Sequence, residues 1–373
     1  MQTPNMRKLI ICTLLTLCCS CNGVAAEPQQ PGQPATQPAA DYALVNPNAT
    51  PEAKRVFNFL KANYGKKILS ATVANVDWNI REAQNVNKWT GHYPAINVFD
   101  FINFRSSKDV NSKGWIDYSD ISVVRDWWKA GGLVGCMWHW NMQANNGVDQ
   151  TCTPGTQPGQ TSFDVSKLDD PSSAERKQID KDLNQIAGYL KKMQKAGIVV
   201  IWRPLHEAAG NTYEFKGGSA WFWWGAKGAE PFKKLWRYMY NKLVNEQNLN
   251  NLIWVWTSQV DDTTWYPGDD VVDIIGRDNY YCLQYPVAKE FKRLSQLYPN
   301  KMVTLAECGN GDEVHMSQLK DLWDEGAHFS WFMPWYDYAY NAGQSDEHQF
   351  ATQQWWTAAL SSGYVLMRDD VKY

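Results

Sequence analysis

The sequence lacks a strong charge imbalance. Its 373 residues include 36 Lys and Arg against 39 Asp and Glu, so the formal net charge is −3. Proteins that bind nucleic acid or anionic membranes through electrostatics usually carry a clear excess of positive charge. We therefore expect no nucleic-acid partner and no binding to an anionic membrane surface.

Long hydrophobic runs are also missing. Beyond the N-terminal segment no stretch reaches 18 apolar residues, so we expect no membrane-spanning helix. At the N-terminus two basic residues precede the nine-residue run Leu9–Leu17, which predicts a signal peptide over residues 1–21. Cys21 is a candidate lipid-modified cysteine of the lipoprotein type, and Val24-Ala25-Ala26 is the competing cleavage site. Either reading predicts export, to the periplasm or to a lipid anchor in the outer membrane.

Cysteines are scarce outside that segment. The four that remain are Cys136, Cys152, Cys282 and Cys308, which are spaced too widely for a zinc signature. Export would permit a disulfide, and Cys282 with Cys308 is the first pair to test. Buried free thiols are the alternative, because a chain of this size can build a sufficient core without a covalent link.

Aromatic residues, in contrast, are abundant. The chain has 20 Trp, 18 Tyr and 13 Phe. A buried tryptophan or tyrosine needs a hydrogen-bond partner for its N–H or O–H group. This number therefore indicates flat stacking surfaces in addition to a core.

The arrangement of apolar runs predicts the fold class. Residues 22–40 are rich in Pro, Gln and Ala and predict a linker, and residues 41–373 predict one domain. Within that domain short apolar runs alternate with amphipathic segments such as Ile179–Met193. Eight strands separated by helices predict an α/β fold, the (β/α)8 TIM barrel. A doubly wound open sheet is disfavoured, since no Gly-rich phosphate-binding turn follows the first strand. The eight runs are Lys67–Thr72, Pro94–Asp100, Gly132–His139, Ile198–Arg203, Leu252–Trp256, Ile274–Asp278, Met302–Glu307 and Phe329–Trp335.

Two glutamates follow strands that face each other in such a barrel. The fourth run continues to Glu207 and the seventh ends at Glu307. Functional residues of TIM barrels lie at the carboxyl ends of the strands, so both carboxyl groups are expected at one barrel mouth. Aromatic residues follow several of the same strands. Two carboxyl groups that flank a bond, with flat rings against a sugar, are the groups that glycoside hydrolysis requires.

Several motifs resemble glycoside hydrolase family 26, a family of retaining (β/α)8-barrel enzymes dominated by β-1,4-mannanases. These are Trp202-Arg203-Pro204-Leu205-His206-Glu207, Trp221-Phe222-Trp223-Trp224-Gly225, Tyr266-Pro267-Gly268-Asp269 ahead of Asp278-x-Tyr280, and Glu307. The most specific element is His206 before Glu207, because most related barrel families have Asn there. The similarity extends from about Asp41 to the C-terminus. One departure is Ala208–Ala220, which is longer than the corresponding segment of the family.

The resemblance implies a role for each matching residue. Glu207 resembles the acid/base and Glu307 the nucleophile, with Tyr280 donating a hydrogen bond to the nucleophile. The other implied substrate contacts are His139, Arg203, His206, Trp221, Asp278 and Trp335. Arg203 is also a candidate to keep Glu307 ionised, and Asp278 either touches the sugar or orients a neighbour. No cofactor is implied.

Other readings of these residues remain open. His139 and His206 could be metal ligands, but no third ligand follows at a matching spacing, so no metal is expected. The same barrel could cleave β-glucan or β-xylan in place of mannan, galactomannan or glucomannan. A glycan-binding lipoprotein without activity is a further alternative, although a protein that only binds glycans does not need both glutamates. We expect a monomer whose partner is a polysaccharide.

One connection is unusually long. Asn141–Glu175 follows the third strand, where barrel connections normally have two to six residues. We expect it to wall one end of the substrate cleft, which would favour short, uniform products such as the disaccharide. A connection that lies flat would leave an open groove for internal attack.

Overall fold

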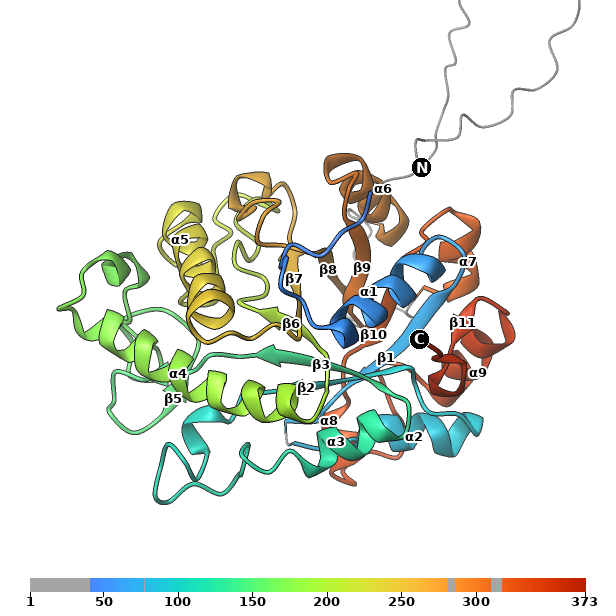
Figure 1. Ribbon diagram of the computed structural model, residues 1–373, viewed down its shortest axis with the longest axis horizontal. Helices are drawn as coiled ribbons and strands as arrows, with labels where there is room; N and C mark the ends of the chain where they lie inside the picture. The colour runs from blue at the N-terminus through green and yellow to red at the C-terminus, as the bar shows by residue number, and fades with distance from the viewer. Residues whose placement is uncertain (1–40, 77, 281–285, 310–316) are drawn as a thin grey trace, which may run out of the picture. The chain divides into compact units, whose positions relative to one another are not determined.

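Eight parallel strands close into a barrel in the computed structural model, which describes residues 41–373 except 77, 281–285 and 310–316. Each strand pairs with the next along the chain, and β10 pairs with β1 to complete the ring. The predicted (β/α)8 barrel is therefore confirmed (Figure 1). The barrel strands are β1 (Ile68–Val73), β2 (Ile96–Asp100), β3 (Leu133–Trp138), β6 (Val200–Pro204), β7 (Leu252–Ser258), β8 (Ile274–Tyr280), β9 (Met302–Gly309) and β10 (Trp331–Pro334).

Three short strands lie outside the ring. β4 (Met142–Gln143) and β5 (Gln150–Thr151) form an antiparallel hairpin in the long connection after β3, and β11 (Val365–Leu366) pairs with β1. The fourth barrel strand is consequently β6 and the seventh is β9.

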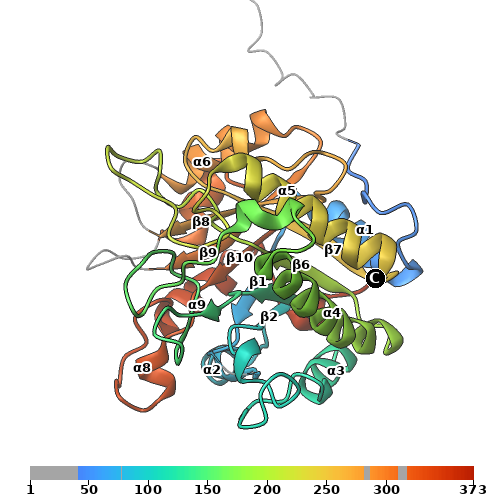
Figure 2. The same cartoon turned by 90° about the vertical axis from the view of Figure 1, so that its left-hand side faces the viewer.

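Helices surround the strands (Figures 1 and 2). The longest, α4 (Ala174–Lys195), begins where the Ser173 side chain accepts a hydrogen bond from the Arg176 backbone N–H group at 3.0 Å. Its apolar residues at intervals of three and four are buried against the strands, as the spacing from Ile179 to Met193 predicts. The other helices are α1 (Pro51–Asn63), α2 (Arg81–Thr90), α3 (Ser122–Lys129), α5 (Ala229–Tyr240), α6 (Val287–Leu297), α7 (Leu319–Asp324), α8 (Tyr338–Asn341) and α9 (Gln353–Ser361).

Two buried apolar clusters hold the strands in place. Every residue of β1, β2, β3 and β7 is buried, as expected for parallel strands that are covered on both faces. Alternate side chains, such as Leu69, Ala71 and Val73 of β1, belong to a cluster inside the barrel. The remaining side chains belong to a larger cluster between the strands and the helices. This alternation makes the barrel a rigid support for residues at the strand ends.

Helix α1 closes the end of the barrel opposite the site. Its buried residues Val56, Phe57 and Leu60 share the inner cluster with strand residues. Proline at its first position and the Thr50 side chain, which accepts from the Ala53 N–H group at 3.1 Å, begin the helix as the sequence predicts. At this end of the barrel the described residues are packed with apolar side chains.

Three of the cysteines have free thiols, namely Cys136, Cys152 and Cys308. The proposed partner Cys282 lies outside the described residues. None of the helices within the described residues combines the length and hydrophobicity that a membrane crossing requires.

Candidate active site

All nine predicted site residues lie at the carboxyl ends of the barrel strands or in the connections that follow. Asp278, Tyr280 and Glu307 are within β8 and β9, and Arg203 is within β6. His139 directly follows β3, and Trp335 directly follows β10. The residues His206, Glu207 and Trp221 lie in the connection between β6 and α5.

The backbone at the end of β6 adopts an unusual conformation. Leu205 and Glu207 have φ angles of 51° and 50°, in the left-handed region that residues with a Cβ atom rarely occupy. The indole of Trp224 donates a hydrogen bond to the His206 carbonyl oxygen at 2.9 Å and helps to hold this turn. Such strained positions concentrate at functional sites, where the surrounding structure fixes them.

Glu207 accepts a hydrogen bond from a neutral donor and lies beside the Asp278 carboxyl group. The Trp221 indole Nε1–H group donates to its Oε2 atom at 2.9 Å. Burial, and after it the negative charge of Glu307, raise the pKa of Glu207 to about 7. The carboxyl group therefore retains its proton more readily than an exposed glutamate does.

Glu307 is held by two donors. Arg203 Nη1 donates to Oε1 at 2.8 Å, and the Tyr280 hydroxyl donates to Oε2 at 2.6 Å. Burial and the charge of Asp278 raise the pKa of Glu307 to about 7, while Arg203 and Tyr280 favour its ionised form. Burial raises the pKa of Tyr280 well above its ordinary value, so its hydroxyl stays protonated and remains a donor.

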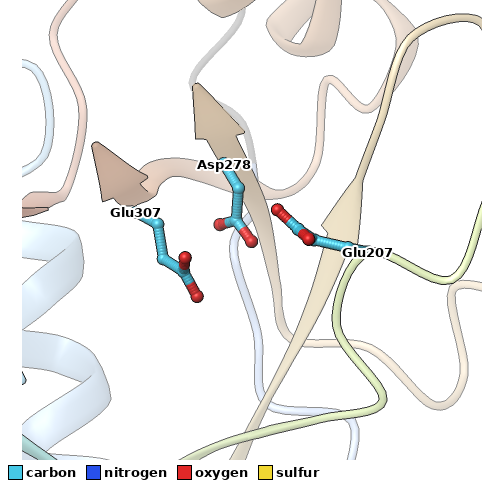
Figure 3. A group of neighbouring side chains, drawn as sticks. All are labelled: Glu207, Asp278 and Glu307. Carbon is cyan, nitrogen blue, oxygen red and sulfur yellow. The ribbon is translucent and has the colours of Figure 1, made fainter. Parts of the chain in front are cut away.

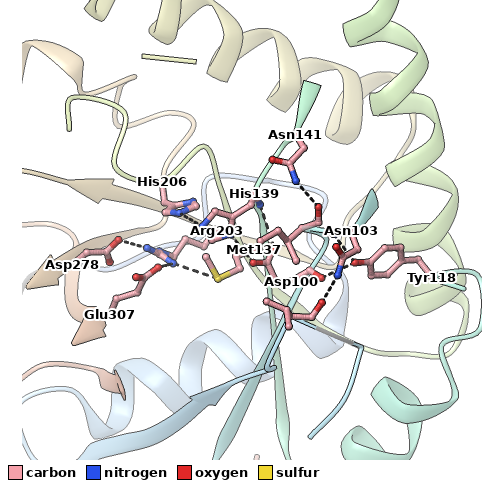
Figure 4. A network of polar contacts seen from close by, with 12 residues as sticks. Asp100, Asn103, Tyr118, Met137, His139, Asn141, Arg203, His206, Asp278 and Glu307 are labelled. Atoms are coloured by element: carbon pink, nitrogen blue, oxygen red, sulfur yellow. Dashed lines mark hydrogen bonds and ion pairs between the residues drawn. The ribbon is translucent and has the colours of Figure 1, made fainter. Parts of the chain in front are cut away.

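Arg203 connects the two strands that carry the acidic groups. It forms ion pairs with Asp278 and Glu307 (Figure 4). Its Nε atom donates to Thr257 Oγ1 at 2.9 Å. Burial disfavours its charge, but the two carboxylates outweigh that effect and raise its pKa. A guanidinium between two carboxylates fixes both in position.

The three carboxyl groups form a compact set. One oxygen from each of Glu207, Asp278 and Glu307 lies within 4.8 Å of the others, and Asp278 lies between the two glutamates (Figure 3). Three carboxylates at this spacing could hold a metal ion. Two of them, however, are already paired with the Arg203 cation. The arrangement therefore fits a set of groups that share protons better than it fits a metal site.

The donors decide which glutamate carries the proton. Buried acidic groups this close cannot all ionise, so their protons leave in coupled steps. Glu307 has two donors, one of them a cation, whereas Glu207 has one neutral donor. The ionised state is thus favoured on Glu307 and the protonated state on Glu207.

Two histidines extend the site toward β2. His139 Nδ1 lies 2.6 Å from an Asp100 carboxylate oxygen, and His139 Nε2 lies 3.1 Å from His206 Nε2. Burial opposes the charged form of His139, but Asp100 outweighs it and raises the pKa of the imidazole. Burial lowers the pKa of His206 well below its usual value. The His139 imidazole therefore binds a proton more readily than that of His206, and one N–H group joins their two Nε2 atoms.

Aromatic rings surround these groups. Trp335 is half-buried, and its ring centroid lies 5.9 Å from that of His139 in an edge contact. Phe222 contacts both His139 and His206. The two histidines are thus bordered by flat rings from the connections that follow β6 and β10.

Asp100 and Thr257 are site residues that the sequence pattern did not single out. Asp100 orients His139 by two contacts. Its carboxylate accepts a hydrogen bond from the His139 backbone N–H group at 3.1 Å and also contacts the His139 ring nitrogen Nδ1. The available signal was an acidic residue at the end of the second apolar run, in the same position as Glu307 in the seventh. Thr257 gave no signal, because a threonine in a strand is ordinary.

Comparisons with known proteins agree with this geometry. The family model described as glycosyl hydrolase family 26 matches residues 45–359. A mannan endo-1,4-beta-mannosidase of Thermothelomyces thermophilus is 32% identical over 92% of this chain and 66% of its own length. Mannan endo-1,4-beta-mannosidase A of a Piromyces species is 33% identical over 78% of this chain and 45% of its own length. The chain therefore spans between about half and two thirds of these curated relatives.

A solved structure is similar over its whole length. The GH26 domain of an endo-beta-mannanase/endo-beta-glucanase from Prevotella bryantii has 38% sequence identity and a TM-score of 0.79. The match covers 88% of this chain and 99% of that domain. Both fold and sequence are thus shared with this domain.

Proposed function

The chain belongs to glycosyl hydrolase family 26, and from this premise we propose that it hydrolyses β-1,4-mannosidic linkages in mannan, galactomannan or glucomannan. In this proposal Glu207 is the acid/base, Glu307 is the nucleophile, and the anomeric configuration of the sugar is retained.

The spacing of the two glutamates is the observation that carries the proposal. One carboxyl oxygen of Glu207 and one of Glu307 lie within 4.8 Å of each other. Retaining glycosidases have carboxyl groups about 5–5.5 Å apart, whereas inverting enzymes need about 6.5–9.5 Å to admit a water molecule. The short spacing supports direct attack by one carboxylate.

The first step needs an ionised nucleophile and a protonated acid. Glu307, kept ionised by Arg203 and Tyr280, attacks the anomeric carbon while Glu207 gives its proton to the departing glycosidic oxygen. The bond to the leaving sugar breaks and an ester between Glu307 and the sugar forms. Trp221 keeps the Glu207 carboxyl group pointed at this oxygen.

The second step reverses the role of Glu207. The ester removes the negative charge of Glu307, which had raised the pKa of Glu207. Glu207 now takes a proton from water, the water oxygen attacks the anomeric carbon, and the ester breaks. The product has the starting configuration, and Glu207 is protonated again.

Contacts with the sugar are assigned to the remaining residues. Within the described part of the chain, His206 Nδ1 is a buried polar atom without a partner, so it is suited to meet a hydroxyl group. Asp278 also interacts with the Glu207 side chain, so it can orient that group as well as meet the sugar. Trp335, half-buried beside His139, offers a ring to the sugar at the cleavage point. These assignments keep the nine residues in one substrate-binding surface.

The names of the relatives support mannan as the substrate, because both curated relatives are mannan endo-1,4-beta-mannosidases. Cleavage of β-glucan or β-xylan on the same barrel is the second candidate, since mannose and glucose differ only in the orientation of one hydroxyl group. A protein that only binds glycans is a weaker candidate, because binding needs no ionised carboxylate held at 2.6–2.8 Å by two donors.

Release of reducing ends from mannan, glucomannan, lichenan and xylan tests the proposal. We expect release from mannan and glucomannan that is abolished in Glu307→Gln. Release only from lichenan or xylan would show that the substrate is β-glucan or β-xylan and not mannan. Tight binding without release would favour the glycan-binding alternative.

A further inference from the structure

A cavity lies beside the connection that follows Glu207. Its volume is about 720 Å³, within the range of roughly 300–1,000 Å³ that ligand pockets have. One wall is the connection between β3 and α4, residues 141–173, and the other is the 208–220 segment after Glu207. Tyr213 and Ala220 line the second wall.

The 208–220 segment has a fixed shape. The backbone of Asn211 donates to the Ser219 carbonyl oxygen at 3.2 Å, and the Asn211 side chain accepts from the Ser219 N–H group at 2.8 Å. Gly210 has a φ of 55°, and a Cβ atom there would lie 2.4 Å from the Ser219 carbonyl oxygen. Only glycine permits this close return of the chain.

The fixed segment presents an aromatic ring to the cavity. Tyr213 lines the cavity and is 43% exposed. Its hydroxyl accepts a hydrogen bond from the buried Trp265 indole at 3.1 Å, and this bond fixes the position of the ring. A half-exposed ring in a pocket wall is suited to stack on the apolar face of a sugar.

The opposite wall is equally fixed. Its residue Cys152 accepts a hydrogen bond from the Trp223 backbone N–H group at 2.9 Å, and the Phe163 ring contacts Trp223 with centroids 4.8 Å apart. The 141–173 connection therefore packs against Trp223, in the connection that follows Glu207. The cavity lies between these two connections.

The lining favours a neutral ligand with many hydroxyl groups. Lys227 is the one charged residue among those described that line the cavity, and it is paired with Asp164 at 3.3 Å. Thr156, Ser162 and Ser219 contribute hydroxyl groups. An anionic or cationic ligand would find no unpaired opposite charge here, whereas a sugar would find a ring and hydrogen-bonding groups.

The position of the cavity identifies which sugars it would take. Ala220 lines it, and the adjacent Trp221 donates to Glu207, the group that protonates the leaving oxygen under the proposed function. We propose that this cavity binds sugar units of the leaving part of a β-mannan chain, with Tyr213 as a stacking platform. The inference rests on the proposed function and adds to it a determinant of chain length.

Two substrates and three variants test this inference. Mannohexaose extends into the cavity, whereas an aryl β-mannobioside has only an aryl group on the leaving side. Tyr213→Ala removes the platform, and Ala226→Trp fills the cavity from an exposed position where a larger side chain leaves the core unchanged. Phe215→Ala is the matched control, since Phe215 is an aromatic residue on the same segment, 58% exposed, that does not line the cavity.

We expect both cavity variants to lower kcat/KM for mannohexaose by about two- to tenfold, the loss of one stacked sugar, with no change for the aryl disaccharide or in Phe215→Ala. The inference is overturned if Ala226→Trp leaves mannohexaose cleavage unchanged, or if both variants lower cleavage of the two substrates equally. An unmodified protein that cleaves neither substrate would overturn the proposed function and this inference together.

Discussion

At the scale of single residues, the site depends on how three closely spaced carboxyl groups share charge with one guanidinium. Arg203 pairs with Asp278 and Glu307 and leaves Glu207 with a neutral donor. The difference between the two glutamates thus comes from their hydrogen-bond donors, because burial acts on both. Removal of one donor should change the balance in a predictable direction.

Tyr280→Phe tests that balance through the pH profile. The substitution removes the 2.6 Å hydrogen bond that favours ionised Glu307, so the pKa of Glu307 should rise. The acid limb of kcat/KM should therefore move to higher pH, while the alkaline limb, which reports loss of the Glu207 proton, should move less. An acid limb that stays in place or moves to lower pH would contradict the role assigned to Tyr280.

Glu207→Gln tests how the raised pKa of Glu207 changes the free energy of unfolding with pH. Burial raises the pKa of Glu207 from 4.5 to about 7, a shift worth roughly 3 kcal/mol. A carboxyl group whose pKa is raised on folding favours the folded state when protonated, and this advantage is lost as the pH rises from 4.5 to 7. Relative to the unmodified protein, the free energy of unfolding of Glu207→Gln should thus increase across this range and stay constant above it. Denaturant titrations at several pH values measure this, and a difference independent of pH would contradict it.

At the scale of elements, the barrel strands were predictable and some site contacts were not. Each of the eight apolar runs ends at a polar or aromatic residue, so both the strand and its functional end can be recognised along the chain. The contact between Asp100 and His139 joins two different strands, and no local pattern reveals it. The ion pair of Arg203 with Asp278 requires the closed ring for the same reason.

The end of β10 carries the aromatic ring with the clearest expected effect. Trp335 is half-buried at the mouth, and its backbone N–H group donates to the Cys308 carbonyl oxygen at 2.8 Å, a contact that does not need the side chain. Trp335→Ala should therefore lower kcat/KM at least about tenfold, through loss of stacking in the transition state, with the fold intact. Trp115→Ala is the control, since Trp115 is 56% exposed and has no assigned role. Unchanged kinetics with unchanged circular dichroism would show that Trp335 does not contact the sugar.

At the scale of the whole molecule, the connections on the carboxyl side set the extent of the cleft. The 141–173 connection contains the β4–β5 hairpin and lies against the segment that follows Glu207, whereas α1 closes the opposite end of the barrel. Whether this connection also blocks one end of the cleft stays a prediction, as do export, the lipid anchor at Cys21 and a monomeric state. The residues that would decide the anchor lie outside those described.

The products released early in the reaction test whether the 141–173 connection closes one end of the substrate cleft. If the connection walls the cleft, short uniform oligosaccharides such as the disaccharide should dominate from the first time points, because few sugars fit beyond the cut. Chromatography of mannan digests gives the distribution. A broad ladder of lengths at early times would show an open groove and internal attack.

The central claim is that Glu207 and Glu307 have different roles in a retaining reaction, and azide rescue tests it most directly. With an aryl β-mannobioside, whose leaving group needs no protonation, Glu207→Ala should form the glycosyl-enzyme and release a β-configured glycosyl azide when azide is added. Glu307→Ala has no nucleophile, so azide should attack from the opposite face and give the α-anomer. Proton NMR of the two products distinguishes them, and the same anomer from both variants would contradict the assignment.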